Sequence, residues 1–284
     1  MILTNSTAAR VQGSTVTGII SVSSTFLQFM QYAALTVSSA ISGTIGLVKN
    51  GAAQLTLSGT CTYTGATQIN AGTLSITGAS TLNGVISGSG SLTKTGTAVL
   101  TIGGNNTYSG GTSFVSGGLA GLIEYSSNNA FGTGLFTLSN AAGRIDTGGN
   151  VTLSNNFQLN TSLQYRTIGA NTITVTGNIA GTGNVSKTGN GILILSGTLT
   201  YTGQTIITTG SIQASKTTGT STATASFGTI ATLSVSFNVP PAAGTQTFRF
   251  FQGSTSRTYT AVTLVNAPGR TATYNSTNST LTVT

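Results

Sequence analysis

Few residues of this chain could do chemistry. The 284 residues include no His, two carboxylate side chains, Glu124 and Asp146, and one thiol, Cys61. General acid-base and nucleophilic catalysis need titratable groups whose pKa values lie near the working pH. A Cys-His or Ser-His-Asp site is excluded without histidine, and no His/Cys/Asp/Glu cluster could hold zinc. We therefore expect a protein that is not an enzyme and that uses no metal and no cofactor.

The two carboxylates are the one catalytic alternative. Glu124 and Asp146 are 146 − 124 = 22 residues apart. On adjacent coils of a repetitive β structure they would lie roughly 5 Å apart, near the carboxylate spacing of a retaining glycosidase. Two isolated surface acids near Arg144 are the simpler interpretation, because nothing in the sequence places either acid in a cleft. Glycan cleavage would require both side chains to face one groove.

The composition indicates an ordered chain with an almost uncharged surface. Charged residues make up 4% of the sequence, and 10 Lys and Arg against 2 acids give a net charge of +8. These cations form no run and accompany no nucleic-acid-binding motif, so we expect no nucleic-acid partner. No stretch reaches the roughly 20 apolar residues that span a bilayer, and no secretory signal is recognisable. With one cysteine, an intramolecular disulfide is excluded, and we expect Cys61 to be a buried thiol.

The elements that would position any site come from an internal repeat. Residues 41–76, 86–119 and 179–212 align with one another, and residues 131–177 fit a fourth, degenerate unit of about 45. Equivalent positions recur at offsets of 45 and 93 residues, namely Lys49, Lys94 and Lys187, then Tyr63, Tyr108 and Tyr201, then Gly72, Gly117 and Gly210.

Short β-branched runs alternate with Gly, Asn, Ser and Thr clusters inside each unit, which is typical of strands and turns rather than helices. A unit of about 45 residues is natural for two coils of about 22, so the repeat predicts stacked parallel strands in an all-β solenoid. We expect a cap or anchoring segment at 1–40, solenoid repeats at 41–217, and a β cap or attachment module at 218–284. Near the first end, Ser24 and Thr25 could cap a short helix through Phe26, Phe29 and Met30, and a strand is the alternative.

Side chains alternate between the two faces of a strand, and the apolar residues two positions apart therefore share one face. This alternation predicts a core that contains Leu92, Leu100, Ile102, Leu193 and Leu195. Coil stacking also predicts that Lys49, Lys94 and Lys187 form a column on one outer face, with offsets of two and four coils. Such a column could bind an anionic polysaccharide or lipid headgroups, or it could simply keep that face soluble. Likewise, Tyr63, Tyr108 and Tyr201 could stack on sugar rings, or they could pack over a turn.

The segment SGSGSLTKTGTAVLTIGGNNTYSGGTSFVSGGL closely resembles the passenger-associated repeat of bacterial autotransporters, and the resemblance extends over roughly residues 41–212. It implies a right-handed parallel β-helix exposed outside the cell as an adhesive or spacing stalk. Similar repeats occur in phage and virion appendages, and no signal peptide or translocator barrel is recognisable here.

Two functions follow from this resemblance. One is a multi-copy structural component of a virion or surface filament, a homo-oligomer that binds its own copies and neighbouring structural proteins. The other is an adhesive passenger that binds host glycans, for which a surface polysaccharide would be the partner. Both functions place the protein on a virion or an extracellular surface.

Overall fold

The computed structural model describes the backbone of residues 2–3, 9–11, 15–16, 21–22, 26–30, 33–118, 121–228, 232–259 and 261–284. Side chains are described from Phe26 onward within these ranges, except at positions 116 and 232. This part of the chain forms strands, turns and bends without any helix, which confirms the predicted all-β class. It divides into two compact units, 1–146 with 154–156, and 147–153 with 157–284.

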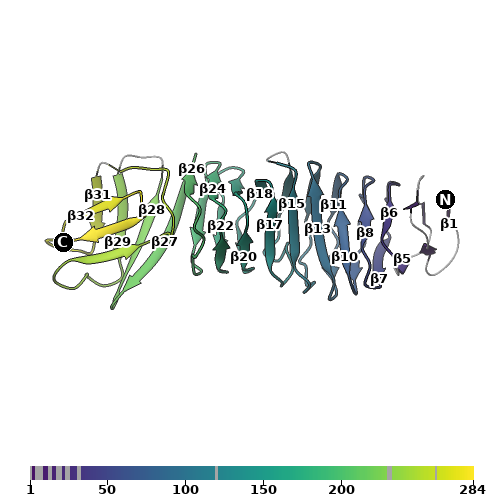
Figure 1. The fold of residues 1–284 in the computed structure, drawn as a ribbon, viewed down its shortest axis with the longest axis horizontal. Helices are drawn as coiled ribbons and strands as arrows, with labels where there is room; N and C mark the ends of the chain where they lie inside the picture. The colour runs from purple at the N-terminus through teal and green to yellow at the C-terminus, as the bar shows by residue number, and fades with distance from the viewer. Residues whose placement is uncertain are drawn as a thin grey trace. The chain divides into compact units, whose positions relative to one another are not determined.

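In the first unit, parallel strands stack in three columns (Figure 1). One column holds β2 (Ala9–Val11), β5 (Phe26–Met30), β7 (Gly46–Asn50), β9 (Thr67–Ile69) and β12 (Ile86–Ser87). A second holds β3 (Thr15–Val16), β6 (Leu35–Val37), β8 (Leu55–Leu57), β10 (Thr73–Ile76), β13 (Ser91–Gly96), β15 (Thr112–Ser116) and β17 (Phe136–Asn140). The third holds β11 (Ser80–Leu82), β14 (Val99–Ile102), β16 (Leu122–Tyr125) and β18 (Gly143–Thr147), and β1 (Ile2–Leu3) pairs with β4 (Ser21–Val22). Successive coils each add a strand to the second column, whereas the first column ends at β12 and the third begins at β11. The stacked parallel strands confirm a β-solenoid.

Neighbouring coils lie in register at a separation of 18 to 24 residues. The separation is 18 where Thr73 pairs with Ser91 and 24 where Thr112 pairs with Phe136. The predicted length of about 22 lies within this range. Coils of unequal length remain in register because the turns between the strands absorb the extra residues.

Alternation along each strand sends every second side chain inward. Leu92, Leu100 and Ile102 are fully buried in the first unit, as predicted from their parity. Polar side chains also connect the coils, as expected for an Asn- and Thr-rich solenoid. Asn70 Nδ2, for example, donates to Asn50 Oδ1 of the preceding coil at 2.7 Å.

Glycine lets the coils approach closely at some corners. Gly65, Gly84 and Gly104 stack above one another on successive coils. A Cβ at Gly84 would lie 2.2 Å from the Gly65 carbonyl oxygen, and one at Gly104 would lie 2.5 Å from the Gly84 carbonyl oxygen. At these corners, the spacing of the coils leaves no room for a side chain.

The Phe26–Met30 segment is a strand, not the short helix. β5 pairs in parallel with β2 and β7, and Leu27 and Phe29 are buried on its inner face while Phe26 is exposed. The apolar residues Leu27 and Phe29 are two apart, as in a strand with one buried face. This spacing, and not the helix-like spacing of Phe26, Phe29 and Met30, matches the structure. Ser24 and Thr25 lie outside the described residues. Parallel pairing therefore already includes strands N-terminal to position 41.

The second unit repeats the columnar pattern in its own strands. Parallel pairs join β20 (Phe157–Leu159) to β23 (Ile179–Gly181), β21 (Leu163–Thr167) to β24 (Val185–Thr188), and β24 in turn to β26 (Thr205–Ile207). They also join β19 (Val151–Leu153), β22 (Thr172–Val175), β25 (Ile192–Leu195) and β27 (Ser211–Thr218). Leu193 and Leu195 are buried here, as predicted.

Pairing changes direction at β27, close to the predicted boundary at 217/218. β28 (Ser221–Phe227) runs antiparallel to β27 and β29 (Thr232–Phe237) antiparallel to β28, while β31 (Ala261–Val265) is parallel to β29. β33 (Thr280–Val283) lies antiparallel between β30 (Gln246–Arg249) and β32 (Ala272–Asn275). The Phe227 ring packs against Phe250 and Phe251, with centroid separations of 5.3 and 5.1 Å. This antiparallel, aromatic-rich part pairs with the edge of β27, where an unpaired strand would expose its hydrogen-bonding groups.

Candidate functional site

The three repeat lysines lie inside the protein, and their ammonium groups are bound by backbone carbonyls. Lys49 in β7, Lys94 in β13 and Lys187 in β24 are each 0% exposed. Lys49 Nζ donates to the carbonyls of Asn50 and Gly51 at 3.2 and 2.7 Å. The same pattern, from the lysine to the two following carbonyls, recurs at the other positions: Lys94 Nζ to Thr95 and Gly96 at 2.5 and 3.1 Å, and Lys187 Nζ to Thr188 and Gly189, both at 2.7 Å.

A Lys-X-Gly sequence forms this lysine corner. The glycines Gly51, Gly96 and Gly189 have φ values of 81°, 71° and 78°, a backbone region that residues with a Cβ rarely adopt. At this turn the carbonyls of the X and Gly residues accept from Nζ, because the lysine side chain follows the inner face of its own strand. Burial lowers the pKa of Lys94 and of Lys187 to about 8 from 10.5, and it lowers the pKa of Lys49 as well.

The predicted outer column of lysines is therefore wrong. Along β13, Leu92 and Lys94 are two residues apart and both point inward. In addition, the repeat offset of 94 − 49 = 45 residues is not a whole number of coils, since the intervening coils have 18 to 20 residues. Lys49 accordingly belongs to the column of β7 and Lys94 to that of β13, where its neighbours across the ladder are Ile76 and Phe114.

The repeat tyrosines are also internal. Tyr63, Tyr108 and Tyr201 are buried, and each hydroxyl is hydrogen bonded to a threonine hydroxyl four residues later. The partners are Thr67 at 2.7 Å, Thr112 at 2.5 Å and Thr205 at 2.6 Å. Burial raises the pKa of all three phenols above their ordinary 10.0. The proposed stacking on sugar rings is a second correction, because no face of these rings is accessible to a ligand.

The two carboxylates are neighbours, as their spacing predicts. Glu124 in β16 and Asp146 in β18 are register partners on adjacent coils. Asp146 is buried, and Arg144 Nε lies 3.1 Å from its Oδ1. Glu124 Oε2 accepts from the Thr101 hydroxyl at 3.1 Å. Asp146 is therefore close to Arg144 as predicted, but the expectation of two isolated surface acids is wrong, because Asp146 is buried in an ion pair and lies opposite Glu124.

No group of three or more His, Cys, Asp or Glu that could hold a metal occurs among the described residues. Cys61 is a buried free thiol, and burial raises its pKa to about 11. A nucleophilic thiol requires the opposite shift.

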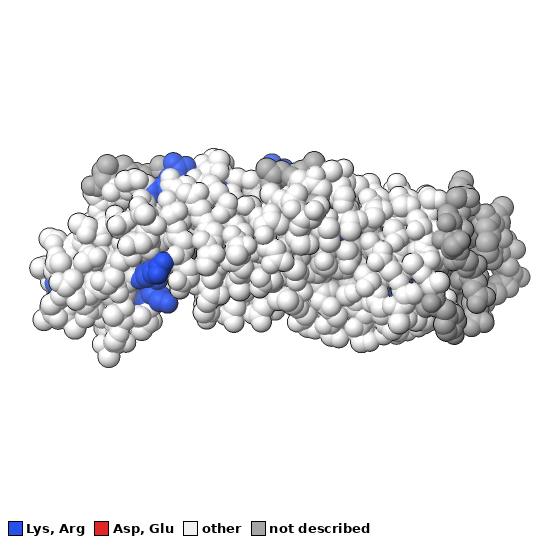
Figure 2. All heavy atoms as spheres, in the orientation of Figure 1, with Lys and Arg blue, Asp and Glu red and all other residues white. Residues whose placement is uncertain are grey.

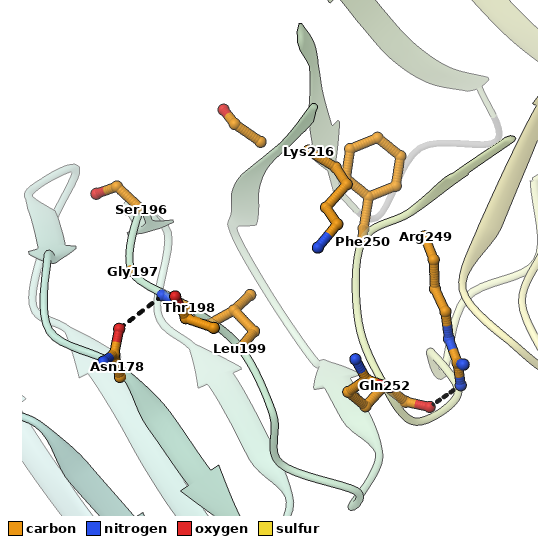
Figure 3. Close-up of a pocket in the computed structure, with 10 residues that line it drawn as sticks. Asn178, Ser196, Gly197, Thr198, Leu199, Lys216, Arg249, Phe250 and Gln252 are labelled. Carbon is orange, nitrogen blue, oxygen red and sulfur yellow. Dashed lines mark hydrogen bonds between the residues drawn. The ribbon is translucent and has the colours of Figure 1, made fainter. Parts of the chain in front are cut away.

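One pocket was missed from the sequence. It has a volume of about 270 Å³ and lies in the second unit, where turns of the last parallel coils meet β27 and the segment after β30 (Figure 3). Its polar lining includes Asn178, Ser196, Thr198, Lys216, Arg249 and Gln252. The sequence offered one sign of it: Lys216 is not part of a Lys-X-Gly sequence and follows the last repeat unit, so it differs from the three repeat lysines.

A known family repeat matches the three segments that contain the lysine corners. The passenger-associated-transport-repeat matches three times, at residues 47–76, 92–120 and 185–214. Each match places its corner lysine two residues, and its buried tyrosine sixteen residues, after the first matched position. The search found no matching curated protein and no matching solved structure.

Within the described residues, no helix is long and apolar enough to cross a membrane. The family repeats point to an extracellular or surface location, and the stacked parallel strands give them their structure. This chain is a β-solenoid in which three segments match the passenger-associated-transport-repeat, and in these segments it is similar to autotransporter passengers.

Proposed function

We propose that this protein is a non-enzymatic structural solenoid, present in many copies on an outer surface, whose repeats act as a spacer. The observation that carries the proposal is the lysine corner. Residues that would make a repeated ligand-binding face are used by the fold itself, since Lys49, Lys94 and Lys187 donate to their own turns. What the repeats present outward is mainly hydroxyl and amide groups, which suits a spacer.

Sparse charge supports assembly into several copies. Figure 2 shows one face on which Lys and Arg interrupt a mostly uncharged surface and on which no Asp or Glu is visible. Little like-charge repulsion then keeps copies apart, and many weak hydrogen bonds can form between hydroxyl- and amide-rich faces. The partners we propose are further copies of the chain and neighbouring structural proteins, in a surface filament or a virion appendage.

Sedimentation and electron microscopy of material from the natural source test this role. The proposal expects several copies attached to a filament, a particle or a cell envelope. Finding only dispersed monomers, with no copy attached to a larger structure, would rule it out.

The non-enzymatic part has its own test. Asp146 is buried against Arg144, so the pair lacks the solvent-facing acid and nucleophile of a glycosidase. Replacing both acids, with Glu124→Gln and Asp146→Asn, should leave every biological activity unchanged. Arg144→Gln is a matched control for the loss of the ion pair alone. A polysaccharide-depolymerising activity that is present in the parent and absent only from the double variant would refute this part.

An adhesive passenger is the second candidate function, and the pocket of the second unit favours it. A glycan array probed with the intact chain separates the two. A spacer alone should retain no glycan, whereas an adhesin should retain a defined subset.

A further inference from the structure

The pocket beside β27 contains cations that the surrounding protein does not neutralise. Residues 147–284 contain six Lys and Arg but no Asp or Glu, because both carboxylate side chains of the chain precede residue 147. Lys187 is committed to its corner, and Arg257 donates to the Ile207 carbonyl at 2.9 Å. Lys216 is different, because it is exposed on β27 and its ammonium has no hydrogen-bond partner among the described residues.

Arg249 also lines the pocket, but its guanidinium lies beyond Gln252 from the Lys216 ammonium (Figure 3). Its Nε donates to the Phe251 carbonyl at 3.2 Å and its Nη2 donates to the Gln252 carbonyl, while Nη1 has no such partner in the described part of the chain. Figure 3 shows the Lys216 side chain reaching into the space between the Thr198–Leu199 turn and Gln252. One cation is therefore fixed by the backbone, and the other is free to adjust to a ligand.

The rest of the lining suits a hydroxylated ligand. Ser196, Thr198 and Gln252 provide hydroxyl and amide groups, and Asn178 Oδ1 positions the turn by accepting from the Thr198 amide at 2.9 Å. A volume of about 270 Å³ is just below the roughly 300–1,000 Å³ of pockets for drug-sized ligands, so it fits one or two small polar units. An apolar ligand is disfavoured, since Phe250 is buried and Leu199 is only half exposed.

We propose that this pocket binds the carboxylate or sulfate group of an acidic saccharide, with Lys216 on the anion and the hydroxyl and amide groups on the sugar. Hydrogen bonds between a charged donor and an anion are about twice as strong as neutral ones. This site goes beyond the spacer role, and the spacer role stands if the site fails.

The test is isothermal titration calorimetry of the full chain with four probes of similar length. They are oligogalacturonate for carboxylate, a heparin-derived oligosaccharide for sulfate, a neutral malto-oligosaccharide, and a single-stranded oligothymidylate. We expect one or both acidic saccharides to bind at least about tenfold more tightly than the neutral one, since one charge-assisted hydrogen bond corresponds to ten- to hundredfold in Kd. Which acidic probe binds better identifies the anion.

Three variants locate the site. Lys216→Met should raise Kd about tenfold, and Lys216→Arg should restore binding, because the side chain is exposed and has no structural partner to lose. Arg270→Met removes the same charge from a residue that does not line the pocket and should change Kd by less than about threefold. Because Arg270 donates to the Ala242 carbonyl at 2.8 Å, circular dichroism must first show that this variant is folded. Equal binding of the neutral saccharide, equal weakening by Lys216→Met and Arg270→Met, or oligothymidylate binding as tight as the saccharides would each overturn the proposal.

Discussion

A single added methyl group at Gly84 tests the stacking of the coils. The Gly84→Ala variant would place a Cβ 2.2 Å from the Gly65 carbonyl oxygen of the preceding coil. Neither backbone can yield alone, since the neighbouring Thr67 amide donates to the Val85 carbonyl at 2.9 Å across the same two coils. The strain therefore acts on the contact between coils rather than on a flexible side chain.

The expected cost follows from that geometry. Restoring an ordinary contact requires the coils to separate by about 1 Å, which would break the Thr67 to Val85 hydrogen bond. Losing a buried hydrogen bond costs about 1–3 kcal/mol, and overpacking costs a further 1–3 kcal/mol. We expect the free energy of unfolding to fall by about 3 kcal/mol.

Urea titration followed by far-ultraviolet circular dichroism measures this change. Gly148→Ala is the matched control, because a Cβ there meets no atom within 4 Å and its φ lies outside the left-handed region. Its effect should stay within about 0.5 kcal/mol. If Gly84→Ala unfolds at the same urea concentration as Gly148→Ala, the glycine stack does not set the spacing of the coils.

Two further predictions concern the buried tyrosines and lysines. In the same titration, Tyr63→Phe should destabilise the protein by about 2 kcal/mol and Tyr108→Phe by about 1 kcal/mol. The reason is that the Thr112 hydroxyl keeps a hydrogen bond to the Phe131 carbonyl at 3.1 Å, whereas the Thr67 hydroxyl has no second partner in the described part of the chain. The second prediction concerns pH. The pKa of Lys94 and of Lys187 is about 8 in the folded protein and 10.5 in the unfolded chain, so the unfolded chain binds more protons between these values. The free energy of unfolding should therefore rise from pH 8 to pH 9. Above pH 10 the buried phenols keep protons that the unfolded chain loses, so stability should fall again, and a flat profile of urea midpoints would contradict both shifts.

Much of the fold could be predicted from the repeat. Leu92, Leu100 and Ile102 are inward because apolar residues two apart on a strand share a face, and register repeats align such faces from coil to coil. The same rule applied to residues 26–30 would have favoured the strand, since Leu27 and Phe29 have its period while Gln28 lies between them.

The lysine corners could not be found by treating charge as a sign of exposure. Leu47 and Lys49, Leu92 and Lys94, and Val185 and Lys187 each share the parity of the core, and a Gly follows each of these three lysines by two residues. That combination predicts an inward lysine whose ammonium meets the carbonyls of a left-handed turn. The pocket at Lys216 was out of reach, because it depends on where residues 249–252 lie against the last parallel coils, and no local pattern encodes that arrangement.

The most direct test of the central claim, that the repeat's lysines hold the solenoid together rather than face a ligand, is the acetylation rate of each lysine in the folded chain. The sequence contains four lysines, of which only Lys216 is exposed. Peptide-resolved mass spectrometry should find Lys216 modified at the rate of a free amine. Lys49, Lys94 and Lys187 should be protected until urea unfolds the protein. Modification of these three at the rate of Lys216 in the native protein would contradict the account.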